Sequence, residues 1–319
     1  MSAPASAPTR AAVAPWRWTA ALLGRLGIRG RTLVIAIPML WLLVFFLIPF
    51  FVVAKISLSQ SAIAMPPFLP LVSWDDALMT ITLNFDNFGY LFDDPLYITA
   101  YFFSIKVAFI SACLTLLVGY PIAYYIARSP ETRRSILLML VILPFWSSFL
   151  LRVYAWQGFL RSNGVINNFL LWTGIIHEPL VMLQTNFAVY LGIVYTYLPF
   201  MILPLYANLV KLDETLLEAS ADLGARPMAT FFHVTLPLSM PGIIAGFMLV
   251  FVPAIGEFVI PELLGGPDTL MIGRVLWNEF FSNRDWPVAS AVAIAMLVAL
   301  VIPIMILRTA QQRAEESEG

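Results

Sequence analysis

Long apolar segments without charge constrain the fold of this chain more than any other feature of its sequence. A helix needs roughly 20 mostly apolar residues to cross about 30 Å of hydrocarbon. Residues 33–54 and 288–307 meet this requirement without a single charge. Of the 319 residues, 60% are hydrophobic and only 12% are charged, too few to cover a soluble exterior. The sequence therefore predicts an all-α, polytopic integral membrane protein.

The order of these segments predicts the domain organisation. Four further spans bring the predicted number of transmembrane helices to six: 98–127, 136–160, 187–210 and 241–261. The run at 33–54 is too long for a signal-peptide core of about 7–15 residues, so we expect an uncleaved anchor helix. The remaining predicted parts are an N-terminal tail (1–32), a loop (55–97), a transmembrane core (98–307) and a C-terminal tail (308–319). The loop is expected to be irregular apart from a short helix near residues 86–92, and residues 163–176 to form a short interfacial helix.

The distribution of Lys and Arg predicts the orientation in the membrane. Most of these residues lie in the two tails and in the loops 128–135 and 211–232. Because short cytoplasmic loops carry an excess of Lys and Arg, both termini are predicted to be cytoplasmic. The loop 55–97 is acidic and is predicted to be external. Its acidic side chains are interpreted either as a solvated surface or as a feature that attracts a cationic solute or a docking protein.

Several functional classes are excluded. A single cysteine, Cys113, allows neither a disulfide framework nor a CxxC metal site, and a net charge of −1 gives no footprint for nucleic acid. None of the three lysines follows a glycine, so there is no phosphate-binding Gly-Lys pair. His177 and His233 are predicted on opposite sides of the membrane and cannot share a metal. We expect a non-enzymatic chain without a metal or cofactor of its own, so any energy from ATP must come through a partner.

One long loop, 211–240, carries the most informative pattern. Thr215 and Glu218 have the spacing of a capping box, which predicts the start of a short helix. Gly224 stands where a left-handed residue would end that helix, and Pro227 prevents its continuation. An ordinary connecting helix is the simple interpretation. The loop is longer than a simple connection requires, however.

The same residues carry a family resemblance. Glu218-Ala219-Ser220, then Gly224, then Leu236-Pro237 and Pro241-Gly242 resemble the EAA loop of bacterial ABC importer permeases, with Ser220 in place of the usual third alanine. The resemblance implies a type I ABC importer permease fold over residues 98–307. It also implies a coupling helix in which Glu218, Ala219 and Gly224 take the docking and turn roles. The implied partners are an ABC ATPase dimer, which binds ATP and Mg, a second homologous permease subunit and an extracytoplasmic binding protein.

A finer resemblance concerns the transported solute. Residues 251–287 and 149–158 are similar to the polyamine branch of that family, most of all to its putrescine-transport permease subunits. The resemblance implies a multi-pass protein of the bacterial inner membrane that carries putrescine, with spermidine as an open possibility. Two rival hypotheses remain. One is a permease of the same fold for an iron complex, sulfate or an amino acid, and the other is an ion-coupled secondary transporter.

Three charges within the predicted spans are candidates for function, because a charge at the bilayer centre costs at least ~2.5–3.5 kcal/mol. They are Lys106, Arg152 and Glu257. A carboxylate among helices suits a diammonium solute through charge-assisted hydrogen bonds. The alternative is that Glu257 neutralises Lys106 or Arg152. Arg152 could also extend toward the outer interface.

Helical spacing places Glu257 among other helices. Gly242, Gly246, Pro253 and Glu257 would lie on one stripe of a continuous helix, and the two glycines form a small-residue seam that allows close approach. Aromatic side chains near Glu257 would add cation–π contacts. Together with Glu257, the candidates for the substrate pathway are Tyr154, Trp156, Tyr197 and Trp277.

Overall fold

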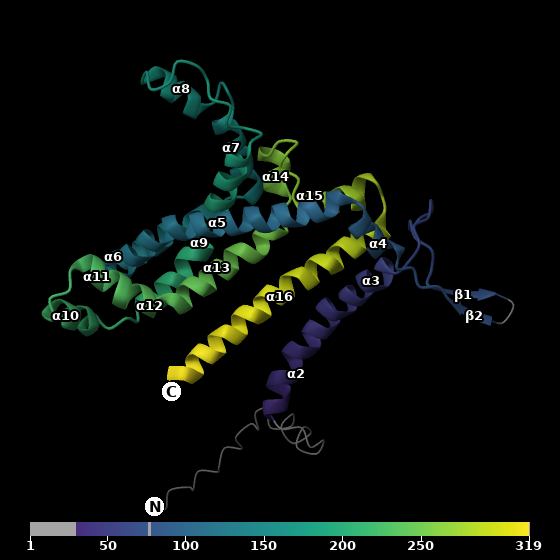
Figure 1. Ribbon diagram of the computed structural model, residues 1–319, viewed down its shortest axis with the longest axis horizontal. Coiled ribbons are helices and arrows are strands. Elements are labelled where there is room, and N and C mark those ends of the chain that lie inside the picture. The colour runs from purple at the N-terminus through teal and green to yellow at the C-terminus, as the bar shows by residue number, and fades with distance from the viewer. Residues whose placement is uncertain (1–29, 76–77, 319) are drawn as a thin grey trace, which may run out of the picture. The chain divides into compact units, whose positions relative to one another are not determined.

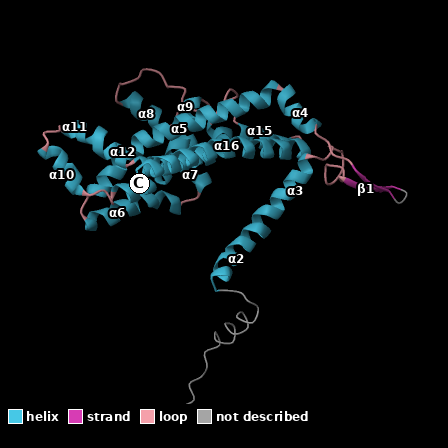
Figure 2. Ribbon diagram, turned by 60° about the horizontal axis from the view of Figure 1, so that its bottom comes forward, coloured by secondary structure: helices cyan, strands magenta, loops and turns pink. Residues whose placement is uncertain are grey.

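The computed structural model of the chain describes residues 30–75 and 78–318. It consists of two compact units, Met1–Ile56 and Ser57–Gly319, which are taken separately below. The predicted N-terminal tail, 1–32, lies almost wholly outside the described residues. Helices account for nearly all the regular structure, with one short hairpin (Figure 2). The all-α prediction is therefore confirmed.

The first unit is one apolar helical segment. It comprises α2 (Gly30–Leu42), the π-helical turn η1 (Leu43–Leu47) and α3 (Ile48–Ser57). Over Val34–Ser57 the segment is long and apolar enough to cross a membrane, and none of its most apolar stretch is buried. An apolar helix with an exposed surface all round is suited to lipid rather than to water. This agrees with the anchor helix predicted over 33–54.

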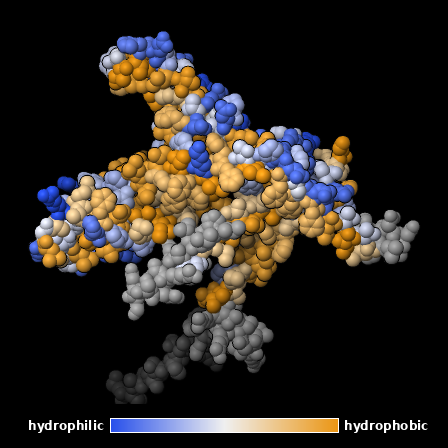
Figure 3. All heavy atoms as spheres, in the orientation of Figure 1, coloured by the Kyte–Doolittle hydropathy of each residue, from blue (hydrophilic) through white to orange (hydrophobic). Residues whose placement is uncertain are grey.

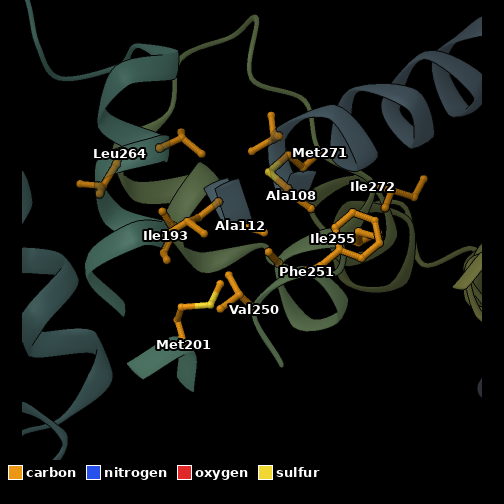
Figure 4. Packing of buried hydrophobic residues seen from close by; sticks show 14 of the residues in the cluster. Ala108, Ala112, Ile193, Met201, Val250, Phe251, Ile255, Leu264, Met271 and Ile272 are labelled. Atoms are coloured by element: carbon orange, nitrogen blue, oxygen red, sulfur yellow. The ribbon is translucent and has the colours of Figure 1, made fainter. Parts of the chain in front are cut away.

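Three helices form the centre of the second unit: α5 (Pro95–Arg128), α9 (Asn186–Leu209) and α13 (Met240–Ile255) (Figure 1). The Asp94 side chain caps α5 by accepting a hydrogen bond from Leu96 N at 2.9 Å, and Pro95 suits the first helical position. Their facing side chains form a closed apolar core (Figure 4). Members of the core include Ala108, Ala112, Ile193, Met201 and Val250.

Small residues set the distance between α9 and α13. A Cβ on Gly242 would lie 2.7 Å from Asn208 Cβ, and one on Gly246 would lie 2.8 Å from Met201 Sδ. Asn208 Cβ is fixed to the backbone and cannot move away, so Gly242 requires glycine at this separation. At Gly246 the Met201 side chain could shift, but a Cβ would still lie 3.1 Å from the Met201 carbonyl oxygen. The predicted small-residue seam is confirmed, and its partner is α9.

The predicted continuous helix over 136–160 is wrong. The chain forms α6 (Glu131–Ile142) and the 3-10 turn η2 (Leu143–Trp146), and then bends by 88° into α7 (Phe149–Leu160) and α8 (Val165–Trp172). At the bend, the Ser147 hydroxyl donates a hydrogen bond to the Pro144 carbonyl at 2.7 Å. If the helix continued, this carbonyl would instead accept from a backbone N–H in the next turn. A hydropathy profile cannot show that a side-chain hydroxyl competes with a backbone N–H for the same carbonyl. Helix α8 lies within the interfacial helix predicted over 163–176.

A second bend precedes α13. Helix α10 (Glu214–Asp222) is followed by α11 (Pro227–Thr230), the π turn η3 (Phe231–Thr235) and α12 (Leu236–Leu238), and the chain then turns by 65° into α13. Helix α13 ends at Ile255, so the helix predicted to reach residue 261 ends early. The chain continues through α14 (Val259–Leu264), α15 (Ile272–Trp277), the π turn η4 (Asn278–Ser282) and α16 (Trp286–Glu318).

The loop at 55–97 is more regular than expected. The short helix α4 (Asp86–Asp93) is confirmed, but the hairpin of β1 (Val72–Asp75) and β2 (Leu78–Ile81) was not predicted. Its register pairs Val72 with Ile81 and Asp75 with Leu78. Helix α4 packs against α5 and α16. The Asn87 amide donates to the carbonyls of Ser57 and Ser59 at 2.9 and 2.8 Å and so fixes the start of the loop.

The surface of the second unit has the pattern of a membrane protein. Apolar side chains cover α5, α9 and α13, whereas hydrophilic side chains gather near α10 and near α4 and α15 (Figure 3). Among the described residues, three helices are long and apolar enough to cross a membrane, or up to five if each bent pair is one span. The helix over Trp286–Val301 is apolar but shorter. The structure supports a multi-pass protein. The number of six spans and the residues at which each span enters and leaves the membrane stay a prediction.

Candidate functional site: an exposed coupling helix and a buried carboxylate

The residue that caps α10 lies two positions before the predicted cap, Thr215. This N-cap is Asp213, whose carboxylate accepts a hydrogen bond from Thr215 N at 3.0 Å. Aspartate caps a helix at least as well as threonine does, so the earlier residue takes the role. Thr215 lies inside the first turn, and the prediction of Thr215 as the cap is wrong. Glu214 is also in the first turn, where its negative charge suits the helix dipole.

The end of α10 agrees with the prediction. Gly224 has φ +79°, the left-handed conformation. Ala225 N donates to Ser220 O at 3.1 Å and Gly224 N donates to Ala221 O at 2.8 Å. This pair of bonds is a Schellman motif, which satisfies two carbonyls at the helix end. Pro227 then starts α11, and the Ser220 hydroxyl lies 2.9 Å from the Thr230 hydroxyl, so the two short helices are joined.

The motif residues of this helix are available to a partner. Glu218, Ala219 and Gly224 are all exposed. Three apolar side chains lie exposed on the same segment: Leu216, Leu223 and Met228, with Leu223 at 89%. We refer to Leu216, Glu218, Ala219, Leu223 and Met228 as the coupling surface. Exposed apolar side chains grouped around a rigid helix end are typical of an interaction site.

The segment carrying the coupling surface is tied to α5 at two levels. At the surface, Arg128 Nη1 lies 3.1 Å from Glu214 Oε1. In the interior, the Tyr120 hydroxyl lies 2.9 Å from the Ser239 hydroxyl, and both residues are buried. The Tyr120 ring also meets Phe231 edge-on, with centroids 5.6 Å apart. A displacement of α10–α12 therefore acts on the end of α5 as well as on α13.

Glu257 lies in the break between α13 and α14, not within a helix as predicted. Its side chain is only 8% exposed. Tyr197 on α9 donates its hydroxyl to Glu257 Oε2 at 2.7 Å. Val259 N and Ile260 N donate to Glu257 Oε1 at 3.1 and 3.4 Å. The carboxylate thus caps α14 and binds α9 at the same time.

The alternative that Glu257 neutralises a basic side chain is contradicted. Among the described residues, Glu257 forms no ion pair with Lys106 or Arg152. Lys106 is exposed on α5. The Arg152 guanidinium lies 4.8 Å from the centroid of the Phe145 ring, and its Nε and Nη1 atoms are buried without a hydrogen-bond partner. Arg152 is therefore held against an aromatic ring rather than by Glu257.

The hydrogen bonds of Glu257 leave it able to bind a cation. An ionised carboxylate offers about four acceptor sites, and three are used by the bonds above. An ammonium group could occupy the remaining site through a charge-assisted hydrogen bond. In the part of the chain that the structure describes, no group of three or more His, Cys, Asp or Glu side chains suited to a metal occurs.

The structure brings some of the predicted aromatic residues to Glu257 and leaves others apart. Tyr197 contacts it directly. Trp277 stacks on Phe258, the next residue in the chain, with centroids 4.4 Å apart and planes 11° from parallel. Trp156 instead packs edge-on against Tyr195 at 5.3 Å. Tyr154 lies exposed on α7. Phe258 was missed, although its position directly after Glu257 was a usable signal.

The fold and the exposed motif of α10 define a class, a multi-pass membrane permease. Residues 117–315 match the family described as binding-protein-dependent transport system inner membrane components, and the chain belongs to this family. It is therefore a membrane transport subunit and not an enzyme.

Individual relatives refine this placement. The chain is 42% identical over 232 residues to the spermidine/putrescine transport system permease protein PotB of Salmonella typhimurium, which covers 73% of this chain and 80% of the relative. It is 40% identical over 276 residues to PotB of Haemophilus influenzae, with 86% and 92% covered. The crystal structure of a bacterial ABC transporter that imports alginate matches with a TM-score of 0.61 at 21% identity, covering 93% of this chain and 96% of that one. That match supports the predicted type I permease fold.

Proposed function

We propose that this chain is a permease subunit of an ATP-driven importer for a polyamine, with putrescine as the main substrate and spermidine as a possible second. The observation that carries the proposal is the buried Glu257 carboxylate, which accepts hydrogen bonds from the Tyr197 hydroxyl and from two backbone N–H groups and is followed in the chain by Phe258. A diammonium solute meets in such a site both a charge partner and aromatic rings. The printed names of the relatives at about 40% identity support the same substrate class.

The partners follow from the coupling surface. In this proposal an ABC ATPase dimer binds ATP and Mg and docks on α10 through Glu218, Ala219 and the turn at Gly224. A second homologous permease completes the pathway, and an extracytoplasmic binding protein delivers the amine. Trp277 contributes to the pathway through Phe258. Tyr154 and Trp156 remain candidates for a part of the pathway away from Glu257.

The proposed orientation places both termini in the cytoplasm of a bacterium, with the chain in the inner membrane. The Arg128–Glu214 pair joins the loops 128–135 and 211–232, both predicted to be cytoplasmic, at one end of the second unit. The acidic residues of α4 lie at the other end (Figure 1). This separation supports the prediction made from Lys and Arg. Labelling of single cysteines placed in either loop, in a Cys113→Ser background, would test it from each side of the membrane.

The central experiment is amine-stimulated ATP hydrolysis. The chain would be co-expressed with an ATPase subunit, a second permease and a binding protein encoded beside it, and the complex placed in lipid discs. We expect putrescine with the binding protein to stimulate hydrolysis, and Glu218→Ala to abolish the stimulation. Co-purification of an ATPase without stimulation by either amine would discard the polyamine and favour another solute. Amine uptake without any ATPase subunit would favour an ion-coupled transporter.

A further inference from the structure

Six aromatic rings form a continuous series from the loop 55–97 to Glu257. In spatial order they are Phe68, Trp286, Phe280, Phe281, Trp277 and Phe258, and we refer to them as the aromatic track. Successive centroids are 6.2, 5.0, 4.9, 4.1 and 4.4 Å apart. The last ring belongs to the residue that directly follows Glu257. The rings come from three separate stretches of the chain, so the series is a product of the fold.

The track is not simply part of the interior. Phe281 is 54% exposed and Trp277 is 40% exposed, while the other four rings are partly buried. The buried part of each ring is held in place by its neighbours, and the exposed part of Phe281 and Trp277 is accessible to a solute. Near its outer end the track borders a cavity of about 440 Å³. Phe280, Phe281 and Trp286 line that cavity, together with the segment 64–67 and Arg284.

On the basis of the proposed function, we infer that the aromatic track binds the ammonium groups of a linear alkyl polyamine and leads it from the outer cavity to Glu257. A cation is attracted to an aromatic face within about 6 Å of the ring centroid. Where two rings stack, as Phe258 on Trp277 and Phe280 on Trp286, their facing surfaces are covered, and an ammonium would contact the faces that remain open. Successive centroids lie 4.1–6.2 Å apart, so an ammonium on the open face of one ring is also close to the next ring. The alkyl chain between two ammonium groups would pack on the same rings as apolar surface.

Opposite charges stand at the two ends of the track. Among the described residues that line the outer cavity, Arg284 is the one with a charge, and it repels a cation there. Glu279 stands on the same π turn as Phe280 and Phe281, with its carboxylate bound by Tyr97 at 2.9 Å and Asn283 at 2.9 Å. Glu257 closes the inner end. The Glu279 carboxylate lines a separate cavity beside α4, so Glu257 is the carboxylate to which the track leads.

The test uses the whole importer and putrescine as the probe. Trp277→Leu and Phe281→Leu remove a ring and keep an apolar side chain, and Trp277→Phe keeps a ring. We expect each Leu variant to weaken putrescine binding to the purified complex, measured by calorimetry without binding protein, by roughly 2- to 30-fold. Trp277→Phe should restore most of the affinity, and Arg284→Gln should strengthen binding. Trp172→Leu, at an 82% exposed site on α8 outside the track, is the matched control.

The possible outcomes distinguish failure of the aromatic-track hypothesis from failure of the proposed function. Unchanged putrescine affinity in both Leu variants, in a complex whose wild-type form takes up putrescine, would refute the track alone. Loss of the second permease or the ATPase from the purified Leu variants would identify the strip as a subunit interface and would also refute it. A wild-type complex that neither binds nor takes up putrescine or spermidine would instead overturn the proposed function.

Discussion

Replacing Glu257 with glutamine removes one charge and almost no volume. Glutamine can still accept from Val259 N and Ile260 N with its oxygen, and its amide can donate to the Tyr197 hydroxyl. Because hydrogen bonds to charged groups contribute about 1.5–3 kcal/mol and neutral ones about 0.5–1.5, the loss at the ammonium is at least about 1 kcal/mol. Coulomb attraction at about 4 Å and an effective dielectric of about 20 sets an upper bound near 4 kcal/mol. We expect putrescine affinity to fall by roughly 5- to 700-fold.

The assay for Glu257→Gln is initial uptake of labelled putrescine by the whole importer in vesicles, with ATP hydrolysis measured in parallel. Glu262→Gln is the matched control, because Glu262 lies on the neighbouring α14, is half exposed and pairs with Arg274 at 2.6 Å. Exposed pairs contribute about 0–1 kcal/mol, so this variant should keep its uptake. Equal co-purification of the ATPase would show that both variants fold. Wild-type uptake by Glu257→Gln would refute the role of the carboxylate.

Three further predictions concern the architecture. Gly224→Ala places a side chain at φ +79° in otherwise open space, so the backbone alone carries a cost of about 1–2 kcal/mol; amine-stimulated hydrolysis should fall, and full stimulation would contradict the role of the turn. Gly242→Ala sets a Cβ 2.7 Å from Asn208 Cβ and should destabilise the chain by about 1–3 kcal/mol, seen as a lower thermal midpoint in detergent; an unchanged midpoint would contradict the seam. Tyr120→Phe and Ser239→Ala each remove one hydroxyl of a buried pair, at about 0.5–1.5 kcal/mol each; their effects on thermal stability should be non-additive, and simple addition would show that the two hydroxyls act independently.

The sequence predicted well which segments are helical, but it did not predict where those helices break and the chain changes direction. Apolar runs located α5 and α9, because hydropathy reports the burial of whole segments in lipid. It missed the breaks after Pro144 and Gly256, because the segments on either side of each break are apolar. Those turns depend on a hydroxyl that competes for a carbonyl and on a carboxylate that caps the next helix. Such contacts depend on a few atoms and leave no trace in a window average.

The candidate site was predicted in part for the same reason. Glu257 stood out because a charge in an apolar segment is costly, and Gly224 because its conformation suits few other residues. Tyr197 was one of several aromatic candidates, and only the packing of α9 against α13 selects it. The order of rings in the aromatic track depends on how three distant stretches meet, which no single stretch reveals.

Helix α13 links the two candidate sites. It begins at Met240, directly after Ser239, and ends at Ile255, two residues before Glu257. At 1.5 Å per residue its 16 residues span about 24 Å. Because a packed helix moves as a rigid rod, a displacement of the elbow at α12 is carried to the break that holds Glu257. The Tyr197 hydroxyl lies on α9, so any sliding of α13 along the glycine seam changes its 2.7 Å contact with the carboxylate. In the proposed importer, α13 therefore provides a direct mechanical route from the coupling surface to the Glu257 carboxylate.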